Sequence, residues 1–411
     1  MPALQREGRR RRRNRLFAYV TLVVVVAGSA GVLGPHILRA SRSSRRVAPI
    51  QTPSPQPTQR QQHVGFNDLR TGWTQLPSPP EVRTITATAW GGGRLFVWGG
   101  IVYTGMSGEP PLSDGFVFDS RSRTWSKIAP SPLAARVLPA TAWTGKEFLV
   151  WGGRGGDAQQ PGFFKDGAAY NPATDNWKKL PPAPVGARAP WSVWTGKEFI
   201  VWGNASRTRR PARDGAAFDP ATTTWHKIAA APIGLTDATA VWTGHEMVVF
   251  GAALDSGNIA RNSTAIGAAY NPKTNTWRRL PDTKLSPQAS TAAWDGHEMI
   301  AWDYLNHTAA YDPQTDFWRR LPPVPLHPAE CRPQSVALDR FVVGDYCGST
   351  ALFDPTSTGY GPAEGAWHDV SATDLAGWGF TLVAADPVAL LLGRGAQSKQ
   401  EAMFAYRPPS H

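Results

Sequence analysis

Short runs of aromatic and β-branched residues alternate with turn-forming residues from Trp73 almost to the end of the chain. Residues 166–204, DGAAYNPATDNWKKLPPAPVGARAPWSVWTGKEFIVWGN, show the full pattern. Asn171-Pro172 predicts a type I turn, because the proline ring pre-sets φ. The two runs on either side of TGKE, residues 195–198, predict a β-hairpin. The unit is therefore four short antiparallel strands: a and b around TGKE, c ending at YNP, and d carrying the tryptophan.

Variants of this unit recur with a mean spacing of about 49 residues. The d-strand tryptophans are Trp73, Trp125, Trp177, Trp225, Trp277, Trp318 and Trp367. The c-strand aromatics are Phe118, Tyr170, Phe218, Tyr270, Tyr311, Phe353 and Phe404 or Tyr406. Both series count seven, and so do the ends of the b strands. Trp73 precedes the first a strand, so we expect an N-terminal d strand to complete the last blade and protect the sheet edges.

The period and the pattern resemble the kelch-repeat β-propeller family. That family pairs a glycine doublet after strand b with an aromatic residue in c and a tryptophan in d. Here WGG begins at Trp98 and Trp151, and WGN at Trp202. The resemblance implies an all-β, seven-bladed kelch-type propeller of four-stranded antiparallel blades over residues 66–411. An open sandwich of similar strands is the alternative, and the in-phase series argue against it.

The N-terminal region predicts a membrane anchor. Residues 1–15 hold seven arginines and one acid, and residues 16–38 hold no Asp, Glu, Lys or Arg over a length that can cross a bilayer. The positive-inside bias places the basic tail in the cytoplasm and the rest outside. Small residues at positions 28–30 leave open a cleaved signal peptide and a secreted protein. Residues 39–65, rich in Pro, Gln and Ser, predict a disordered linker.

The net charge belongs mostly to this N-terminal region. The chain has a formal net charge of +12, and residues 1–65 contain twelve arginines and one glutamate. The propeller region is therefore close to neutral, at about +1. The basic pI says little about the partners of the propeller, and we expect no nucleic acid among them.

The two cysteines, Cys331 and Cys347, flank the sixth a–b hairpin. If Asp339-Arg340 is its two-residue loop, Leu338 pairs with Phe341, and the cysteines lie one residue out of register, which a bulge can absorb. Outside the cytoplasm this predicts a disulfide, with two unpaired buried thiols as the alternative. Two cysteines alone do not predict a metal site.

Catalytic residues are not evident. Galactose oxidase, a kelch-type enzyme, holds copper with tyrosines and histidines, but His245 and His297 stand in the hairpin tips TGHE and DGHE, where other blades have TGKE. Sialic-acid epimerases are also kelch-like, and no residue constellation here matches their catalysis. We therefore predict no catalytic residue, metal or cofactor. An extracytoplasmic carbohydrate-active enzyme of the oxidase or epimerase type remains the alternative function.

Most tryptophans recur at equivalent strand positions, which predicts packing between blades rather than sugar stacking. Three sequons, at Asn204, Asn262 and Asn306, would accept glycans in a secreted eukaryotic protein.

Topology predicts the binding face. The a–b and c–d turns are short and alike, whereas the b–c loops on the opposite face are long and all different. Variation on one rim of a constant scaffold is typical of a binding surface. The candidate ligand-binding residues on this rim are Arg83, Arg136, Arg188 and Arg332 before four a strands, and Arg207, Arg209, Arg210 and Arg213 in the third b–c loop. We expect a protein or anionic-glycan partner. For the four strand-start arginines the alternative is hydrogen bonding between blades.

Overall fold

The computed structural model describes residues 65–84, 86–102, 110–155, 162–203, 211–255, 258–259, 265–286, 291–326, 334–339, 341–346, 349–355, 365–371, 381–394 and 401–409. Every regular element in these ranges is a strand. The predicted tail and anchor and nearly all of the predicted linker fall outside them. No helix within the described ranges has the length and the apolar character to cross a membrane.

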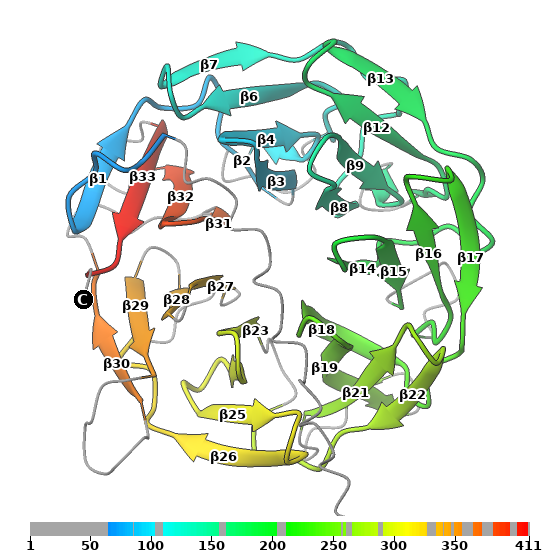
Figure 1. Cartoon of the computed structure of the whole chain (residues 1–411), viewed down its shortest axis with the longest axis vertical. Helices are drawn as coiled ribbons and strands as arrows, with labels where there is room; N and C mark the ends of the chain where they lie inside the picture. The colour runs from blue at the N-terminus through cyan, green and yellow to red at the C-terminus, as the bar shows by residue number, and fades with distance from the viewer. Residues whose placement is uncertain are drawn as a thin grey trace, which may run out of the picture. The chain divides into compact units, whose positions relative to one another are not determined.

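Seven four-stranded antiparallel sheets surround a common centre, as Figure 1 shows. This confirms the predicted seven-bladed propeller. Blade 1 contains β3 (Ala87–Gly91), β4 (Arg94–Trp98), β6 (Gly115–Asp119) and β7 (Thr124–Lys127). Blade 2 contains β8 (Ala140–Trp143), β9 (Phe148–Trp151), β12 (Gly167–Asn171) and β13 (Asn176–Lys179). Blade 3 contains β14 (Trp191–Trp194), β15 (Phe199–Trp202), β16 (Gly215–Asp219) and β17 (Thr224–Ile228).

The other blades repeat this order of a, b, c and d strands from the centre outwards. Blade 4 contains β18 (Leu235–Trp242), β19 (Met247–Asp255), β21 (Ile266–Asn271) and β22 (Thr276–Arg279). Blade 5 contains β23 (Thr291–Trp294), β24 (Met299–Trp302), β25 (Thr308–Asp312) and β26 (Phe317–Leu321). Blade 6 contains β27 (Gln334–Leu338), β28 (Phe341–Tyr346), β29 (Ser349–Asp354) and β30 (Ala366–Asp369). Its hairpin pairs Leu338 with Phe341, in the predicted register.

Blade 7 combines strands from the two ends of the described chain. It contains β31 (Thr381–Ala385), β32 (Val388–Arg394), β33 (Glu401–Arg407) and β1 (Gly72–Leu76). Trp73 of β1 pairs with Tyr406 of β33, and its indole donates a 2.5 Å hydrogen bond to Val370 O beyond blade 6.

The core consists of seven hydrophobic clusters, one between each pair of neighbouring blades. The b strands pack on both faces, and so all four residues of β9, β15 and β24 are buried. Trp98, Trp151, Trp202 and Trp302 at their ends are fully buried. This confirms that the b-strand tryptophans serve blade packing.

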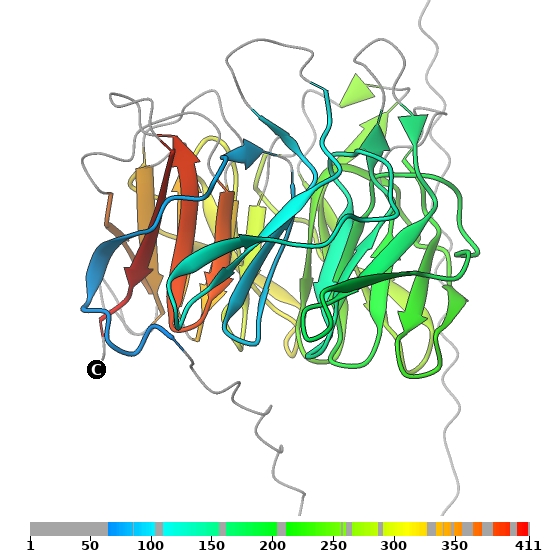
Figure 2. The same ribbon diagram turned by 90° about the horizontal axis from the view of Figure 1, so that it is seen from above.

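Five short strands lie on the edge opposite to the a–b and c–d turns, four in b–c connections and one, β2, in the segment before the first a strand (Figure 2). They are β2 (Arg83–Thr84), which pairs with β5 (Ile101–Val102); β10 (Arg154–Gly155), which pairs with β11 (Gly162–Phe163); and β20 (Asn258–Ile259), which pairs with β19. We call this edge the loop face and the other edge the turn face.

Candidate functional site

Three of the predicted ligand-binding arginines, Arg83, Arg136 and Arg188, lie on the loop face in the segments that lead into the a strands. Their side chains are only 2%, 0% and 5% exposed. Each guanidinium forms an ion pair with the aspartate that directly precedes the c strand of its own blade. The pairs are Arg83–Asp114 at 2.9 Å, Arg136–Asp166 at 2.9 Å and Arg188–Asp214 at 2.8 Å.

Arg83 and Arg136 also bind the backbone at both ends of the b–c connection, and Arg188 binds it at the end of the connection. Arg136 donates to Gly152 O, at the start of the connection, and to the Asp166 carboxylate, at its end, each at 2.9 Å. Arg188 donates to both the carbonyl and the carboxylate of Asp214, at 3.1 and 2.8 Å. We call each such unit an arginine clamp, because one planar guanidinium holds two chain segments together.

Electrostatics and packing stabilise the clamps. The hydrogen bond from Arg188 is the main cause that lowers the pKa of Asp214 below its usual value. Burial lowers the pKa of Arg136, against the effect of Asp166. Arg136 nevertheless stays charged at physiological pH. Its Cζ atom lies 4.0 Å from the ring centroid of Phe164, which places the guanidinium over the ring.

The glycine doublets of blades 1 and 2 link the Arg136 and Arg188 clamps to the preceding blade. Gly100 N donates to Arg136 O at 2.9 Å, and Gly153 N donates to Arg188 O at 2.8 Å. Gly152 has φ +69°, and a Cβ there would lie 2.7 Å from Arg188 O. Only glycine fits this position without strain, which explains the WGG signature.

This environment favours the structural alternative for the three clamp arginines, and a direct role in ligand binding stays a prediction. Arg213 is exposed, and it donates to the carbonyls of Ala231 and Pro232. The remaining candidates, Arg207, Arg209, Arg210 and Arg332, lie outside the described residues, as do Cys331 and Cys347 with their predicted disulfide.

The aspartates of the clamps were not among the residues predicted from the sequence. Their signal is an Asp-Gly pair before the c strand, at positions 114, 166 and 214, in three of the four blades that have the arginine; blade 6 has Arg332 but Cys347-Gly348 before its c strand. Blade 4 has neither: Ile266 stands before Gly267 in place of the aspartate, and residues 229–234 before its a strand contain no arginine. The ion pairs show the pairing directly in blades 1, 2 and 3.

The turn face carries a second repeated arrangement. In blades 1 to 5 the d-strand tryptophan donates its indole N–H to a carbonyl in the segment that follows the d strand of the preceding blade. The pairs run Trp125 to Pro77, Trp177 to Ala129, Trp225 to Pro181, Trp277 to Ala229 and Trp318 to Pro281, at 2.7 to 3.1 Å. These bonds tie the outer edges of neighbouring blades together.

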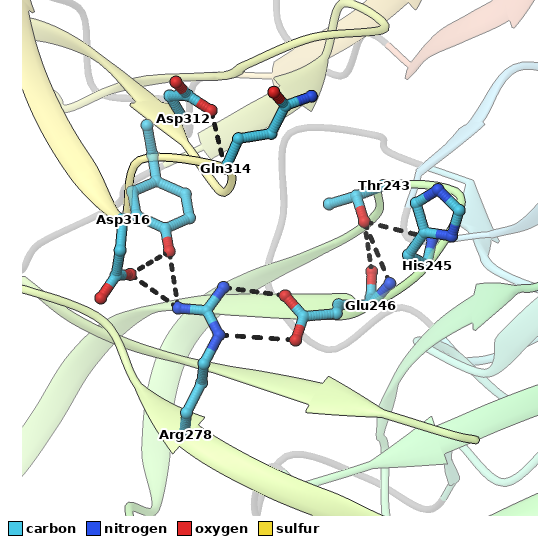
Figure 3. A network of polar contacts seen from close by, with 8 residues as sticks. Thr243, His245, Glu246, Arg278, Asp312, Gln314 and Asp316 are labelled. Atoms are coloured by element: carbon cyan, nitrogen blue, oxygen red, sulfur yellow. Dashed lines mark hydrogen bonds and ion pairs between the residues drawn. The ribbon is translucent and has the colours of Figure 1, made fainter. Parts of the chain in front are cut away.

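A glutamate in the a–b turn faces the residue that follows this tryptophan. In blade 4, Arg278 donates to both carboxylate oxygens of Glu246, at 3.4 and 2.8 Å (Figure 3). In blade 5, Arg319 binds Glu298 in the same way, at 2.8 and 2.5 Å. In blade 3 the equivalent pair, His226 and Glu198, is 3.9 Å apart.

Arg278 also reaches blade 5. It donates to the Tyr311 hydroxyl and to Asp316, both at 2.7 Å (Figure 3). Burial tends to lower the pKa of Arg278, but the hydrogen bonds to Glu246 and Tyr311 outweigh burial and raise it. Burial and the hydrogen bond to Asp316 raise the pKa of Tyr311. The blade 4–5 interface is thus closed by a four-residue network.

The histidines that the sequence placed in turns and loops are found there. His245 and His297 lie in the a–b turns. His307 Nδ1 lies 3.1 Å from Oδ2 of the fully buried Asp303, a pair that the sequence did not reveal. The neighbouring sequon residue, Asn306, is buried and donates to Leu326 O. Within the described ranges, no group of three or more His, Cys, Asp or Glu side chains could hold a metal ion.

Comparison with known proteins supports the fold alone. No protein-family model matches the chain, and no curated protein matches it in sequence. The chain is similar to the solved structure of YjhT, one of 1209 solved chains that match. The similarity has a TM-score of 0.52 at 14% sequence identity, and it covers 72% of this chain and 99% of YjhT. The chain is a seven-bladed β-propeller, and the kelch family remains a resemblance of sequence pattern.

Proposed function

We propose that this protein is a membrane-anchored binding module of the kelch type, whose propeller lies outside the cytoplasm and holds a protein or an anionic glycan on its loop face. A β-propeller is consistent with an interaction module. The proposed anchor is residues 16–38, with the basic tail in the cytoplasm.

The arginine clamps are the observation that carries this proposal. They fix both ends of two b–c connections and one end of a third to one rim of the ring, while the sequences of these connections differ completely. The loop sequences can therefore differ while the ends of the loops keep their positions on the ring. Binding loops on other scaffolds are organised in the same way.

Charge favours an anionic partner. The propeller region is nearly neutral in sum, yet the third b–c loop contains Arg207, Arg209, Arg210 and Arg213 within seven residues. Arginine binds carboxylates and phosphates through paired hydrogen bonds, and such a cluster also speeds encounter with an anionic surface.

Charge reversal tests the binding face. The triple variant with Arg207, Arg209 and Arg210 changed to Glu should keep the melting temperature of the wild type and lose binding to an anionic glycan or peptide array. Arg188→Ala is the matched comparison, because it should lower stability, by about 3 kcal/mol, through loss of its clamp. A wild-type protein that binds no anionic probe at low salt would contradict the proposal.

Membrane extraction tests the anchor separately. The full-length protein should stay in the membrane pellet after carbonate treatment, and external protease should cleave after Arg46. A soluble mature form that begins near Gly31 would instead support secretion.

A further inference from the structure

A groove of about 560 Å³ opens on the turn face between blades 2 and 3. Its walls are the β8–β9 turn and β13 of blade 2, and the β14–β15 and β16–β17 turns of blade 3. Its volume lies within the range of about 300–1,000 Å³ that is usual for small-molecule sites. We call it the lysine groove.

Four lysines line this groove: Lys146, Lys178, Lys179 and Lys197. Lys197 lies 4.0 Å from Asp219, a weak contact for a side chain that is 76% exposed. Among the described residues, the other three lysines form no ion pair. Glu147, which also lines the groove, has no ion-pair partner there either. The groove thus has an excess of positive charge that the propeller itself does not neutralise.

Comparison of equivalent positions in the repeat explains why Lys178 has no ion-pair partner among the described residues. Lys178 lies opposite Ala169 in its blade, as Arg278 lies opposite Ala269, so the two cations hold equivalent places. Arg278 is held across the blade boundary by Tyr311 and Asp316. The equivalents of these acceptors in blade 3 are Phe218 and Thr223, which carry neither a phenol hydroxyl nor a carboxylate.

A second inter-blade bond is also missing at this boundary. At the blade 1–2 and 3–4 boundaries, Asp175 and Asn275 accept a hydrogen bond from the backbone N–H of Ala129 and Ala229 of the preceding blade. The equivalent residues at the blade 2–3 boundary are Pro181, which has no N–H, and Thr223; Pro281 likewise removes this N–H at the blade 4–5 boundary. The blade 2–3 boundary therefore lacks the side chains that close the blade 4–5 boundary.

We infer that the lysine groove binds a carboxylate-bearing oligosaccharide, such as a short oligomer of uronic acids. Spaced ammonium groups match carboxylates that repeat along a sugar chain. Glu147, Asp219 and the threonine hydroxyls can pair with sugar hydroxyls between the carboxylates. The half-buried Trp194 supplies an apolar surface that can pack on a sugar ring.

An acidic peptide suits the groove less well. Its side chains offer only hydrogen-bond acceptors, and Glu147 and Asp219 would repel them. The site is independent of the proposed function, because it lies on the opposite face and uses none of the loop-face arginines.

Calorimetric titration of the full-length protein in detergent with tetragalacturonate at low salt tests the inference. We expect saturable binding that weakens with salt, no binding of the neutral maltotetraose, and none of hexaglutamate. Lys178→Glu should weaken tetragalacturonate binding by about tenfold or more, which corresponds to about 1.4 kcal/mol.

Lys273→Glu is the matched control. Lys273 is an exposed lysine in the β21–β22 turn, on the same face but outside the groove, and its reversal changes the net charge by the same amount. It should leave binding unchanged, as should the triple Glu variant of Arg207, Arg209 and Arg210. No binding of tetragalacturonate, equal loss in the two lysine variants, or stronger binding of hexaglutamate would each overturn the inference. Loss in the triple variant would place the ligand on the loop face and overturn it as well.

Discussion

Arg278 of β22 and Lys178 of β13 occupy the same place in the repeat, one residue after the d-strand tryptophan and opposite an alanine of the c strand. Arg278 donates hydrogen bonds to Glu246, Tyr311 and Asp316, and so joins blade 4 to blade 5 (Figure 3). Lys178 makes no ion pair among the described residues and points its charge into the lysine groove.

The difference depends on two acceptors rather than on the cation alone. Wherever the c-strand aromatic is Tyr in blades 2, 4 and 5, the residue five positions later is Asp or Asn and accepts the phenol hydrogen bond: Tyr170–Asp175, Tyr270–Asn275 and Tyr311–Asp316. Where it is Phe, in blades 1 and 3, that residue is Arg123 or Thr223. One repeat thus builds either a closed boundary or an open one, and only the open one keeps charge available for a ligand.

Among changes at these two boundaries, removal of Arg278 should have the largest effect on stability. Arg278→Ala leaves Glu246, with only 19% of its side chain exposed, without its partner, and we expect a loss of about 2 kcal/mol in the free energy of unfolding. Denaturant unfolding measures it. Arg278→Lys should recover part of the loss, because it restores the charge but not the paired geometry. Wild-type stability in Arg278→Ala would mean that the network does not hold the boundary.

Alkali should weaken the boundaries that contain tyrosine. Burial, helped by the charge of Glu198, raises the pKa of Tyr270 from 10.0 to about 12. The folded state therefore disfavours the phenolate, and the stability contributed by neutral Tyr270 is complete below pH 10 and is lost as the pH rises towards 12.

Unfolding at neutral pH and at alkaline pH, for wild type and Tyr270→Phe, measures this contribution. The variant should lose less stability than the wild type on the move to alkaline pH. An equal loss in both proteins would show that Tyr270 does not titrate in this range. The boundary built on Phe218 has no phenol and should not respond.

Introducing the bridging residues of the blade 4–5 boundary at the blade 2–3 boundary should close it. The combination of Lys178→Arg, Phe218→Tyr and Thr223→Asp supplies blades 2 and 3 with the cation and both acceptors. We expect a gain of about 1 kcal/mol in stability and loss of tetragalacturonate binding, because the new arginine is neutralised within the protein. Lys178→Arg alone should change neither property much. A transplanted protein that still binds the sugar would show that closure is not what separates the two boundaries.

The smallest effect is expected at the open boundary itself. Lys178→Ala should change the free energy of unfolding by no more than about 0.5 kcal/mol, because the side chain is exposed and unpaired. The same variant should weaken sugar binding. A large loss of stability would reveal an internal partner for Lys178 and remove the basis of the groove as a site.

Much of the fold was predictable from local pattern. The period of the tryptophans gave the number of blades, and the short loop at Asp339-Arg340 gave the register of the sixth hairpin, because hairpin pairing is set by a turn of a few residues. The lysine groove could not be predicted in the same way. Lys178 and Lys179 follow Trp177 in the sequence, but no residue of their own blade indicates whether an acidic side chain of the next blade neutralises them.

The sequence by itself determined the repeat, the strands and the turns, since these rest on contacts between residues near each other along the chain. The tertiary structure decided how the charges are used. Arg136 could be assigned to a clamp only once Asp166, thirty residues away, was seen beside it. Lys178 differs from Arg278 through residues of the next blade. Ion pairs and grooves form where separate blades meet, and their energies depend on burial and distance, which only the folded ring establishes.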